Sequence, residues 1–201
     1  MKLMLKNKRL AFPALAKPQA IGDGDPAYGA RLIIDPDDKD VKALDAAMLE
    51  VATRQWKDKG ADILAMLVED KKVCFSKLPY KSTKTGKVYD GFEGKYSLGT
   101  RNPKTRPTAV DAYGTEITDL GQIDRILYAG CKVHAQVEIW AQDNQFGRRI
   151  NCSLLGVMFA GEGPAFGGGS APATADDFAE YAQKPEDALE KASGADGGDY
   201  V

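Results

Sequence analysis

The chain has 201 residues, of which 43% are hydrophobic, and a formal net charge of −2. This length suits one domain with an appendage, and no stretch resembles a signal peptide or the roughly 20 apolar residues of a membrane span. Cys74, Cys131 and Cys152 are odd in number and widely spaced, which argues against a disulfide framework and a zinc site. We therefore expect a cytoplasmic protein with reduced thiols.

Two segments of opposite charge underlie this nearly neutral total. Residues 161–201 carry nine acidic residues against two lysines, a net charge of −7. Residues 71–106 carry ten cations against two acidic residues, a net charge of +8, and they also hold five aromatic residues. Because lysines attract phosphates and exposed rings stack on unpaired bases, the basic segment is typical of a protein that binds single-stranded nucleic acid.

The first elements along the chain predict a β-hairpin. Residues 3–15 form a strand pattern that we expect to be broken at Pro13. Residues 22–26 are a dense turn signal, and residues 28–34 predict the second strand.

The hydrophobic period then changes to that of a helix. Apolar residues three or four apart predict a helix whose buried face runs through residues 41–56, with Trp56 in the core. Asp37 or Asp38 is expected to cap its start, and Gly60 to end it. A second short helix is predicted at residues 61–68.

A β pattern returns in the basic half of the chain. We predict a strand at residues 73–78, a polar excursion at 81–87, a strand at 92–98, an irregular basic loop at 101–107 and an extended segment at 108–113. The cations of this half gather in the excursion and in the loop.

The clearest pair of strands comes last. Residues 132–140 alternate apolar and polar side chains, which predicts a half-buried strand, and residues 148–159 predict its buried partner after a turn. The chain therefore predicts a mainly β fold, an OB-like antiparallel β-barrel with one helical insertion. A generic α+β sheet is the alternative.

The composition changes after Phe159. Glycines and prolines predict a flexible linker, and the acidic residues beyond it predict a disordered tail with a weakly amphipathic stretch. We therefore expect an OB-fold nucleic-acid-binding domain at residues 1–160 and a Gly-rich linker with an acidic flexible tail at residues 161–201.

The candidate DNA-binding residues come from the basic segment and the last hairpin. The candidate phosphate ligands are Lys77, Lys81, Lys84, Lys87, Lys95, Arg101, Lys104, Arg106, Arg148 and Arg149. The candidate stacking rings are Tyr80, Tyr89, Phe92, Tyr96 and Trp140. Each stacked base stabilises a complex by roughly 1–3 kcal/mol. The alternative for each cation is a solvated surface, and for each ring a place in the core.

Catalytic signatures do not appear in the sequence. His134 is the only histidine, and the common nucleophile, phosphate-loop and metalloprotease motifs are missing. The acidic cluster at residues 35–40 is an alternative Mg²⁺ site, but helix capping explains most of it. We expect no enzymatic activity, no metal and no cofactor.

Five short motifs resemble those of a known family. They are Tyr28-Gly-Ala-Arg-Leu-Ile-Ile-Asp-Pro, Gly91-Phe-Glu-Gly-Lys-Tyr-Ser-Leu, Arg106-Pro-Thr-Ala-Val-Asp, Leu127-Tyr-Ala-Gly-Cys-Lys-Val and Gly147-Arg-Arg-Ile-Asn-Cys-Ser-Leu-Leu-Gly-Val. The pattern is similar to that of a family of phage-encoded single-stranded DNA-binding proteins, over most of residues 5–169. The resemblance implies an OB-fold, sequence-independent binding of single-stranded DNA, and a role in phage DNA replication or recombination in the host cytoplasm.

The acidic tail is similar in kind to the partner-docking tails of such proteins. Asp196, Asp199 and Tyr200 are the candidates for docking phage or host replication and recombination proteins, although glycines dilute the acids and the last residue is Val201. The tail is also expected to lie over the DNA-binding groove when DNA is absent. A single-strand annealing protein or recombination mediator and a phage structural or interaction protein are the alternatives, and a homo-oligomer stays open.

Overall fold

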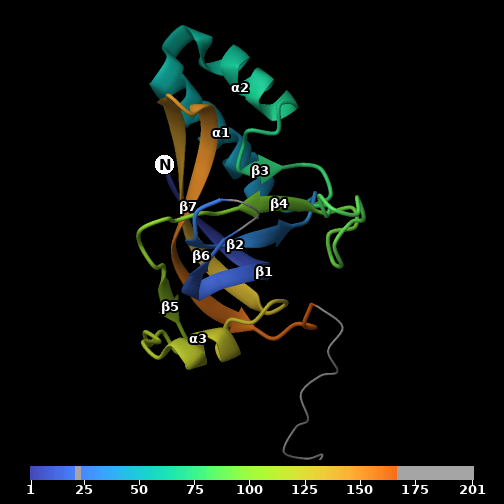
Figure 1. The fold of residues 1–201 in the computed structure, drawn as a ribbon, viewed down its shortest axis with the longest axis vertical. Coiled ribbons are helices and arrows are strands. Elements are labelled where there is room, and N and C mark those ends of the chain that lie inside the picture. Colours follow the sequence, from blue (N-terminus) through green and yellow to red (C-terminus); the bar gives the residue numbers. More distant parts are fainter. Residues whose placement is uncertain (21–23, 167–201) are drawn as a thin grey trace, which may run out of the picture. The chain divides into compact units, whose positions relative to one another are not determined.

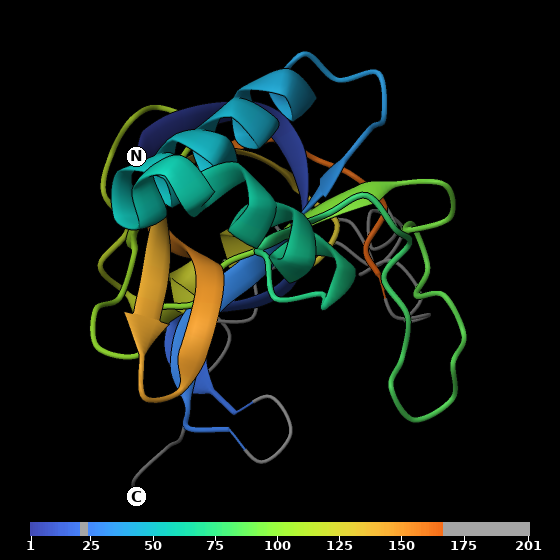
Figure 2. The same cartoon turned by 90° about the horizontal axis from the view of Figure 1, so that it is seen from above.

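The computed structural model describes residues 1–20 and 24–166 (Figures 1 and 2). The predictions for residues 167–201, including the flexible tail, lie outside the described residues. The elements are β1 (Lys2–Gln19), β2 (Ala27–Ile34), α1 (Asp40–Trp56), a 3₁₀ turn (Lys57–Lys59), α2 (Gly60–Glu69), β3 (Phe75–Ser76), β4 (Tyr96–Gly99), β5 (Thr108–Val110), α3 (Leu120–Ile126), β6 (Lys132–Asn144) and β7 (Gly147–Gly161). The strands form one seven-stranded sheet in the order β3-β4-β2-β1-β6-β7-β5.

Strand β1 pairs with two neighbours and holds the sheet together. Residues 2–9 pair antiparallel with β6, and residues 9–19 pair antiparallel with β2, which confirms the predicted first hairpin. The prediction that Pro13 breaks this strand is wrong. The register shifts between Ala11 and Ala14, so Pro13 lies in a bulge, where its missing N–H costs no ladder hydrogen bond.

The sheet curls into an OB-like barrel, but its two edge strands, β3 and β5, do not pair with each other, so the barrel is not closed by a continuous ladder of hydrogen bonds. Single backbone hydrogen bonds span part of the gap: the Ile150 N–H donates to the Lys72 carbonyl at 3.0 Å, and the Arg101 N–H to the Cys152 carbonyl at 2.9 Å. Farther along, β5 pairs with β7 in parallel. The mainly β, OB-like prediction is confirmed, but the barrel is open and its β5–β7 pair is not antiparallel.

The main core follows the predicted alternation along the last hairpin. Val133, Ala135, Val137 and Ile139 of β6 are fully buried, and β6 pairs with β7 along almost its whole length. The buried side chains of α1 pack on the same core, so the helix predicted at residues 41–56 is confirmed. In Figure 1, α1 and α2 lie beside the tip of the β6–β7 hairpin, which Trp56 joins through a 2.7 Å hydrogen bond from Nε1 to Asp143.

The start and the end of α1 both differ from the predictions. The N-cap residue is Lys39, which makes no side-chain cap hydrogen bond, while the Asp38 carboxylate one residue earlier accepts a 2.9 Å hydrogen bond from the Asp40 N–H. Gly60, however, begins α2 instead of ending α1. A Cβ atom on Gly60 would lie 2.6 Å from Cα of Thr53, so only glycine allows α2 to turn back closely against α1.

The strands between the helices and the last hairpin are shorter than predicted. The predicted strand at 92–98 is β4, which begins only at Tyr96, and the segments predicted at 73–78 and 108–113 are reduced to β3 and β5. Helix α3 was not predicted at all. None of the described helices is both long enough and apolar enough to cross a membrane.

Candidate nucleic-acid interface

The outer face of β1 and β2 carries a second, smaller apolar cluster. Because side chains alternate along a strand, Leu32 and Ile34 enter the main core while Arg31 and Ile33 point to the opposite face. Ile33 there packs with Ala11 and Phe92. The loop at residues 77–95 therefore folds across the outside of the barrel.

Four rings meet on this face, and we refer to Phe12, Tyr80, Tyr89 and Phe92 as the aromatic cluster. The rings of Tyr80 and Tyr89 are stacked with centroids 5.3 Å apart, and Phe12 meets Tyr89 edge to face at 5.0 Å. Phe92 is 1% exposed, whereas Tyr89 is 37% and Phe12 is 48% exposed. Phe92 thus supports the cluster from below, and Tyr89 and Phe12 offer ring surface to solvent.

Phe12 was not among the candidate residues. Its backbone lies in the left-handed region, at φ 48°, within the bulge that contains Pro13. This conformation costs a residue other than glycine roughly 1–2 kcal/mol. A proline inside a strand pattern is the sequence signal that indicates such a bulge.

Arg31 joins the aromatic cluster to the barrel. Its guanidinium carbon lies 3.7 Å from the centroid of the Tyr80 ring, and Nη1 donates to the Ser97 hydroxyl at 3.1 Å. Burial lowers the pKa of Arg31, an effect that Tyr80 partly offsets. Because an arginine keeps its charge in proteins, this cation remains positive beneath the loop.

The lysines of this loop fall into two groups. Lys81, Lys84 and Lys87 are exposed and form no ion pair with any described residue. They lie on a small hairpin closed by a 3.0 Å hydrogen bond from the Tyr89 N–H to the Tyr80 carbonyl. These three lysines are therefore available to phosphates next to the exposed ring of Tyr89.

Two other predicted cations are already paired. Lys77 contacts Asp45 of α1 at 2.7 Å. Lys95 is hydrogen-bonded to Asp35, and this bond raises the pKa of Lys95. Both pairs lie at the surface, where an ion pair stabilises a protein by only about 0–1 kcal/mol, so a phosphate can compete for either lysine.

The basic loop at residues 101–107 lies on the other side of the barrel from the aromatic cluster. In both views the 77–95 loop (green) is on the right and the connection from β4 to β5 (yellow-green) is on the left (Figures 1 and 2). The continuous basic segment of the sequence is therefore divided between two surfaces. Asn102 anchors the surface formed by the 101–107 loop, through a 2.6 Å hydrogen bond from its Nδ2 to the Leu154 carbonyl.

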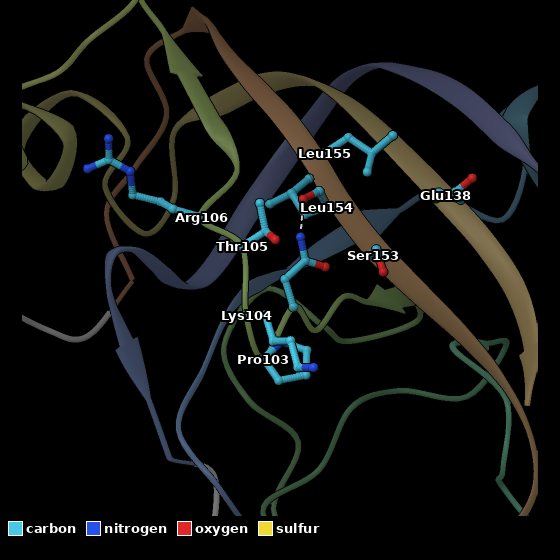
Figure 3. Close-up of a pocket in the computed structure, with 9 residues that line it drawn as sticks. Pro103, Lys104, Thr105, Arg106, Glu138, Ser153, Leu154 and Leu155 are labelled. Carbon is cyan, nitrogen blue, oxygen red and sulfur yellow. Dashed lines mark hydrogen bonds between the residues drawn. The ribbon is translucent and has the colours of Figure 1, made fainter. Parts of the chain in front are cut away.

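This second surface contains a hollow of about 320 Å³. Figure 3 shows the loop residues, including Lys104 and Arg106, on one side of it and Glu138, Ser153 and Leu155 on the other. Trp140 is 40% exposed, and its Nε1 donates to the Ser153 hydroxyl at 3.2 Å. Lys104 and Arg106 form no ion pair within the described parts of the chain.

The remaining candidates lie apart from both surfaces or at their margins. Tyr96 packs edge to face against Phe75, with ring centroids 6.0 Å apart, and contacts the main core. Arg101 donates to the backbone carbonyl of Asp25 at 2.7 Å, beside the loop between β1 and β2. At the tip of the last hairpin Arg148 lies 3.2 Å from Asp143, and Arg149 is exposed.

The last described residues return to the aromatic cluster. The Gly163 N–H donates to the Tyr128 hydroxyl at 3.1 Å, which anchors the segment after β7. Phe166 then lies beneath the guanidinium of Arg9, 4.1 Å from ring centroid to Cζ, and against Gly91, where a Cβ would be 2.4 Å from the ring. The chain thus leaves the described barrel beside the 77–95 loop.

The acidic cluster is engaged in protein contacts. Lys8 is 3% exposed and lies between Asp38 and Asp40, at 2.7 Å from Oδ2 of Asp40. Within residues 1–20 and 24–166, no group of three metal-binding side chains is found.

The buried thiol of Cys131 is a separate feature. Burial raises the pKa of Cys131 to about 12, so this thiol is not activated as a nucleophile.

An OB-like barrel whose outer face carries exposed rings, and lysines that pair with no described residue, combines the features that single-strand-binding proteins use. The profile of the family described as "Enterobacter phage Enc34, ssDNA-binding protein" matches residues 1–189, and the chain belongs to this family. Protein p50 of Acyrthosiphon pisum secondary endosymbiont phage 1 is 32% identical over 191 residues, which are 94% of this chain and 98% of p50. The family resemblance predicted from the sequence is confirmed.

Solved structures support the same fold. The single-stranded DNA-binding protein of bacteriophage Enc34, in complex with ssDNA, has a TM-score of 0.68 and 24% identity, covering 83% of this chain and 89% of that chain. The single-stranded DNA-binding protein gp2.5 of bacteriophage T7 has a TM-score of 0.51 and 16% identity, covering 92% of this chain and 97% of that chain.

Proposed function

We propose that this protein binds single-stranded DNA without sequence preference and protects it during phage DNA replication or recombination, in the host cytoplasm and without catalytic activity. The observation that carries the proposal is the loop at residues 80–92, which presents the half-exposed ring of Tyr89 beside three lysines that form no ion pair with a described residue. Membership of a family described by ssDNA binding supports it.

The loop supplies both parts of sequence-independent binding. Lys81, Lys84 and Lys87 neutralise successive phosphates, which releases counterions and makes the affinity dependent on salt. Tyr89 stacks on a base, and every base has a flat face that a ring can cover. Tyr80 and Phe12 hold that ring in place, since Tyr80 stacks on Tyr89 and Phe12 meets it edge to face.

The second surface extends the path of a longer strand. Lys104 and Arg106 offer two cations on a loop at the other side of the barrel, and the half-exposed ring of Trp140 adjoins this surface through its hydrogen bond to Ser153. A short oligonucleotide fits on one surface only. A longer one wraps from the loop at residues 80–92 to the loop at residues 101–106, and we assign Arg148 and Arg149 to the margin of that path.

We further propose that the chain consists of a DNA-binding domain and an acidic tail. The hydrogen bonds of Gly163 and the packing of Phe166 support a boundary slightly beyond residue 160. The tail competes with DNA for the lysines near the aromatic cluster, because its negative charge resembles that of a phosphate backbone. Asp196, Asp199 and Tyr200, outside the described residues, remain our candidates for docking replication or recombination proteins.

A titration across a salt series tests DNA binding. Dye-labelled oligo-dT should bind the full chain tightly at low salt, and the log–log slope of affinity against salt should steepen by roughly 0.7 for each neutralised phosphate. Duplex DNA of equal length and an RNA strand are run beside it. Absence of binding to oligo-dT at low salt, or equal affinity for the duplex, contradicts the proposal.

A further inference from the structure

We propose that Phe12 forms, with Tyr89, a nucleobase subsite in which the exposed ring of Phe12 stacks on an unpaired base. This inference rests on the proposed binding of single-stranded DNA and adds a residue from β1 to a surface otherwise built by the 77–95 loop. It follows from the backbone of Phe12, the packing of its ring and the charges beside it.

The backbone conformation of Phe12 is unfavourable for a phenylalanine. Its φ of 48° belongs to the left-handed region, which glycine and asparagine adopt more readily than a bulky residue does. Burial of the ring does not explain the residue, because 48% of Phe12 is exposed. A strained backbone that presents a large apolar ring to solvent indicates a function for that ring.

The ring is also held in one orientation. Phe92 lies nearly parallel to it, with an interplanar angle of 20° and centroids 6.1 Å apart. Tyr80 and Tyr89 approach it edge to face, with centroids at 5.8 and 5.0 Å. Neighbours on three sides fix the ring before any ligand arrives, so stacking a base on it requires little further ordering.

The chemistry of the surroundings favours a nucleobase over the side chain of a protein partner. Tyr89 adds a second half-exposed ring, and the hairpin that it closes carries Lys81, Lys84 and Lys87. Rings and unpaired lysines on one loop fit a ligand in which flat bases alternate with phosphates. The sequence-independent character of the site is kept, because Phe12 offers no hydrogen bond to distinguish one base from another.

The test separates stacking from a structural role. Phe12→Leu keeps an apolar side chain of similar bulk but removes the flat ring, and its affinity is compared with that of the wild type on two strands. One is oligo-dT, and the other is an abasic strand of equal length with the same phosphates and no bases. Tyr113→Leu is the matched control, because Tyr113 is 93% exposed and lies in the turn after β5, outside the aromatic cluster.

Phe12→Leu is expected to weaken binding to oligo-dT by about 5- to 150-fold, the equivalent of one stacked base, and to leave binding to the abasic strand unchanged. Tyr113→Leu should change neither. Equal losses on both strands mean that Phe12 only supports the loop, and no loss on oligo-dT means that no base stacks there; either result overturns the inference. If the wild type itself does not bind oligo-dT, the proposed function fails first, and the inference falls with it.

Discussion

The guanidinium carbon of Arg31 lies 3.7 Å from the centre of the Tyr80 ring, so a strand of the barrel holds the candidate interface loop through a cation–π contact. No strand pairing fixes residues 77–95 to β2, and the backbone hydrogen bonds within this loop join it only to itself, as in the β-bridge between Lys81 and Val88. The position of the loop therefore depends on side chains packed against the outer face of the sheet.

We predict that Arg31→Met loosens this loop. The substitution keeps an apolar stem but removes the cation–π contact, which stabilises a protein by about 0.5–2 kcal/mol. Amide hydrogen exchange at Tyr89 should accelerate, and affinity for oligo-dT should fall. Arg31→Lys retains the charge but not the planar group, and should give an intermediate result. Unchanged exchange at Tyr89 in Arg31→Met would contradict a role of the Arg31 contact in holding the loop.

A second prediction concerns the ion cluster that joins β1 to α1. Lys8→Ala leaves Asp38 and Asp40 without their buried partner, so the free energy of unfolding should fall by about 3–5 kcal/mol in urea denaturation. Lys6→Ala, at an exposed position on the same strand, is the control and should change little.

The same cluster gives a dependence on pH with a definite sign. Burial opposes ionisation of Asp38, but hydrogen bonds from Lys8 and from the Asp40 N–H outweigh it, and the pKa of Asp38 is lowered from 3.8. Its stabilising effect is therefore complete above the unfolded-state pKa and is lost as the pH falls through the lower folded-state pKa. The difference in unfolding free energy between wild type and Asp38→Asn should shrink below about pH 4. A difference that stays constant down to about pH 2 would contradict this account.

A third prediction separates the two basic surfaces. Three double variants each remove two charges: Lys84→Ala with Lys87→Ala, Lys104→Ala with Arg106→Ala, and the control Lys42→Ala with Lys59→Ala. The first should weaken binding to short and long oligo-dT and lower the salt slope by roughly 1.4, for two phosphates. The second should weaken binding to long strands only, because its loop lies on the other side of the barrel. Equal effects of all three would mean that only the total charge matters.

The acidic tail gives a fourth prediction. Removal of residues 170–201 should tighten binding to oligo-dT at low salt, and this gain should fade as salt screens the charges. A full-length variant with the tail's acidic residues changed to Asn and Gln separates charge from length and should behave like the truncation. If the variant with the neutral tail binds DNA as weakly as the native protein does, competition by charge is ruled out, and partner docking or solubility remains as the role of the tail.

The elements that could be predicted are those with a regular hydrophobic period. The alternation from Val133 to Ile139 and the helical stripe at residues 41–56 record directly which side chains face the core. Helix α3 was missed because its seven residues bury only Ile123, although Asp119 caps it with a 2.7 Å hydrogen bond from the Gln122 N–H. In the sequence, an Asp followed by so short an apolar pattern cannot be distinguished from the patterns of many turns.

The candidate site was harder to predict because it is made by tertiary contacts. Phe12 comes to the surface where β1 bulges in its pairing with β2. The division of residues 71–106 between two surfaces depends on the path of the chain after β4, and loops carry no hydrophobic period that records such a path. Composition indicated the class of ligand that the family description names, but not which rings and cations meet.

The double pairing of β1 has a consequence for the newly made chain. Residues 9–19 pair with β2, which follows at once, but residues 2–9 pair with β6, which begins only at Lys132, so they leave the ribosome long before their partner strand exists. At roughly 5–20 residues per second, this strand edge waits unpaired for several seconds, open to the same edge of another copy. Lys2, Lys6 and Lys8 carry three positive charges along it. Identical edges therefore repel each other during synthesis, before any of these lysines reaches its place in the finished barrel.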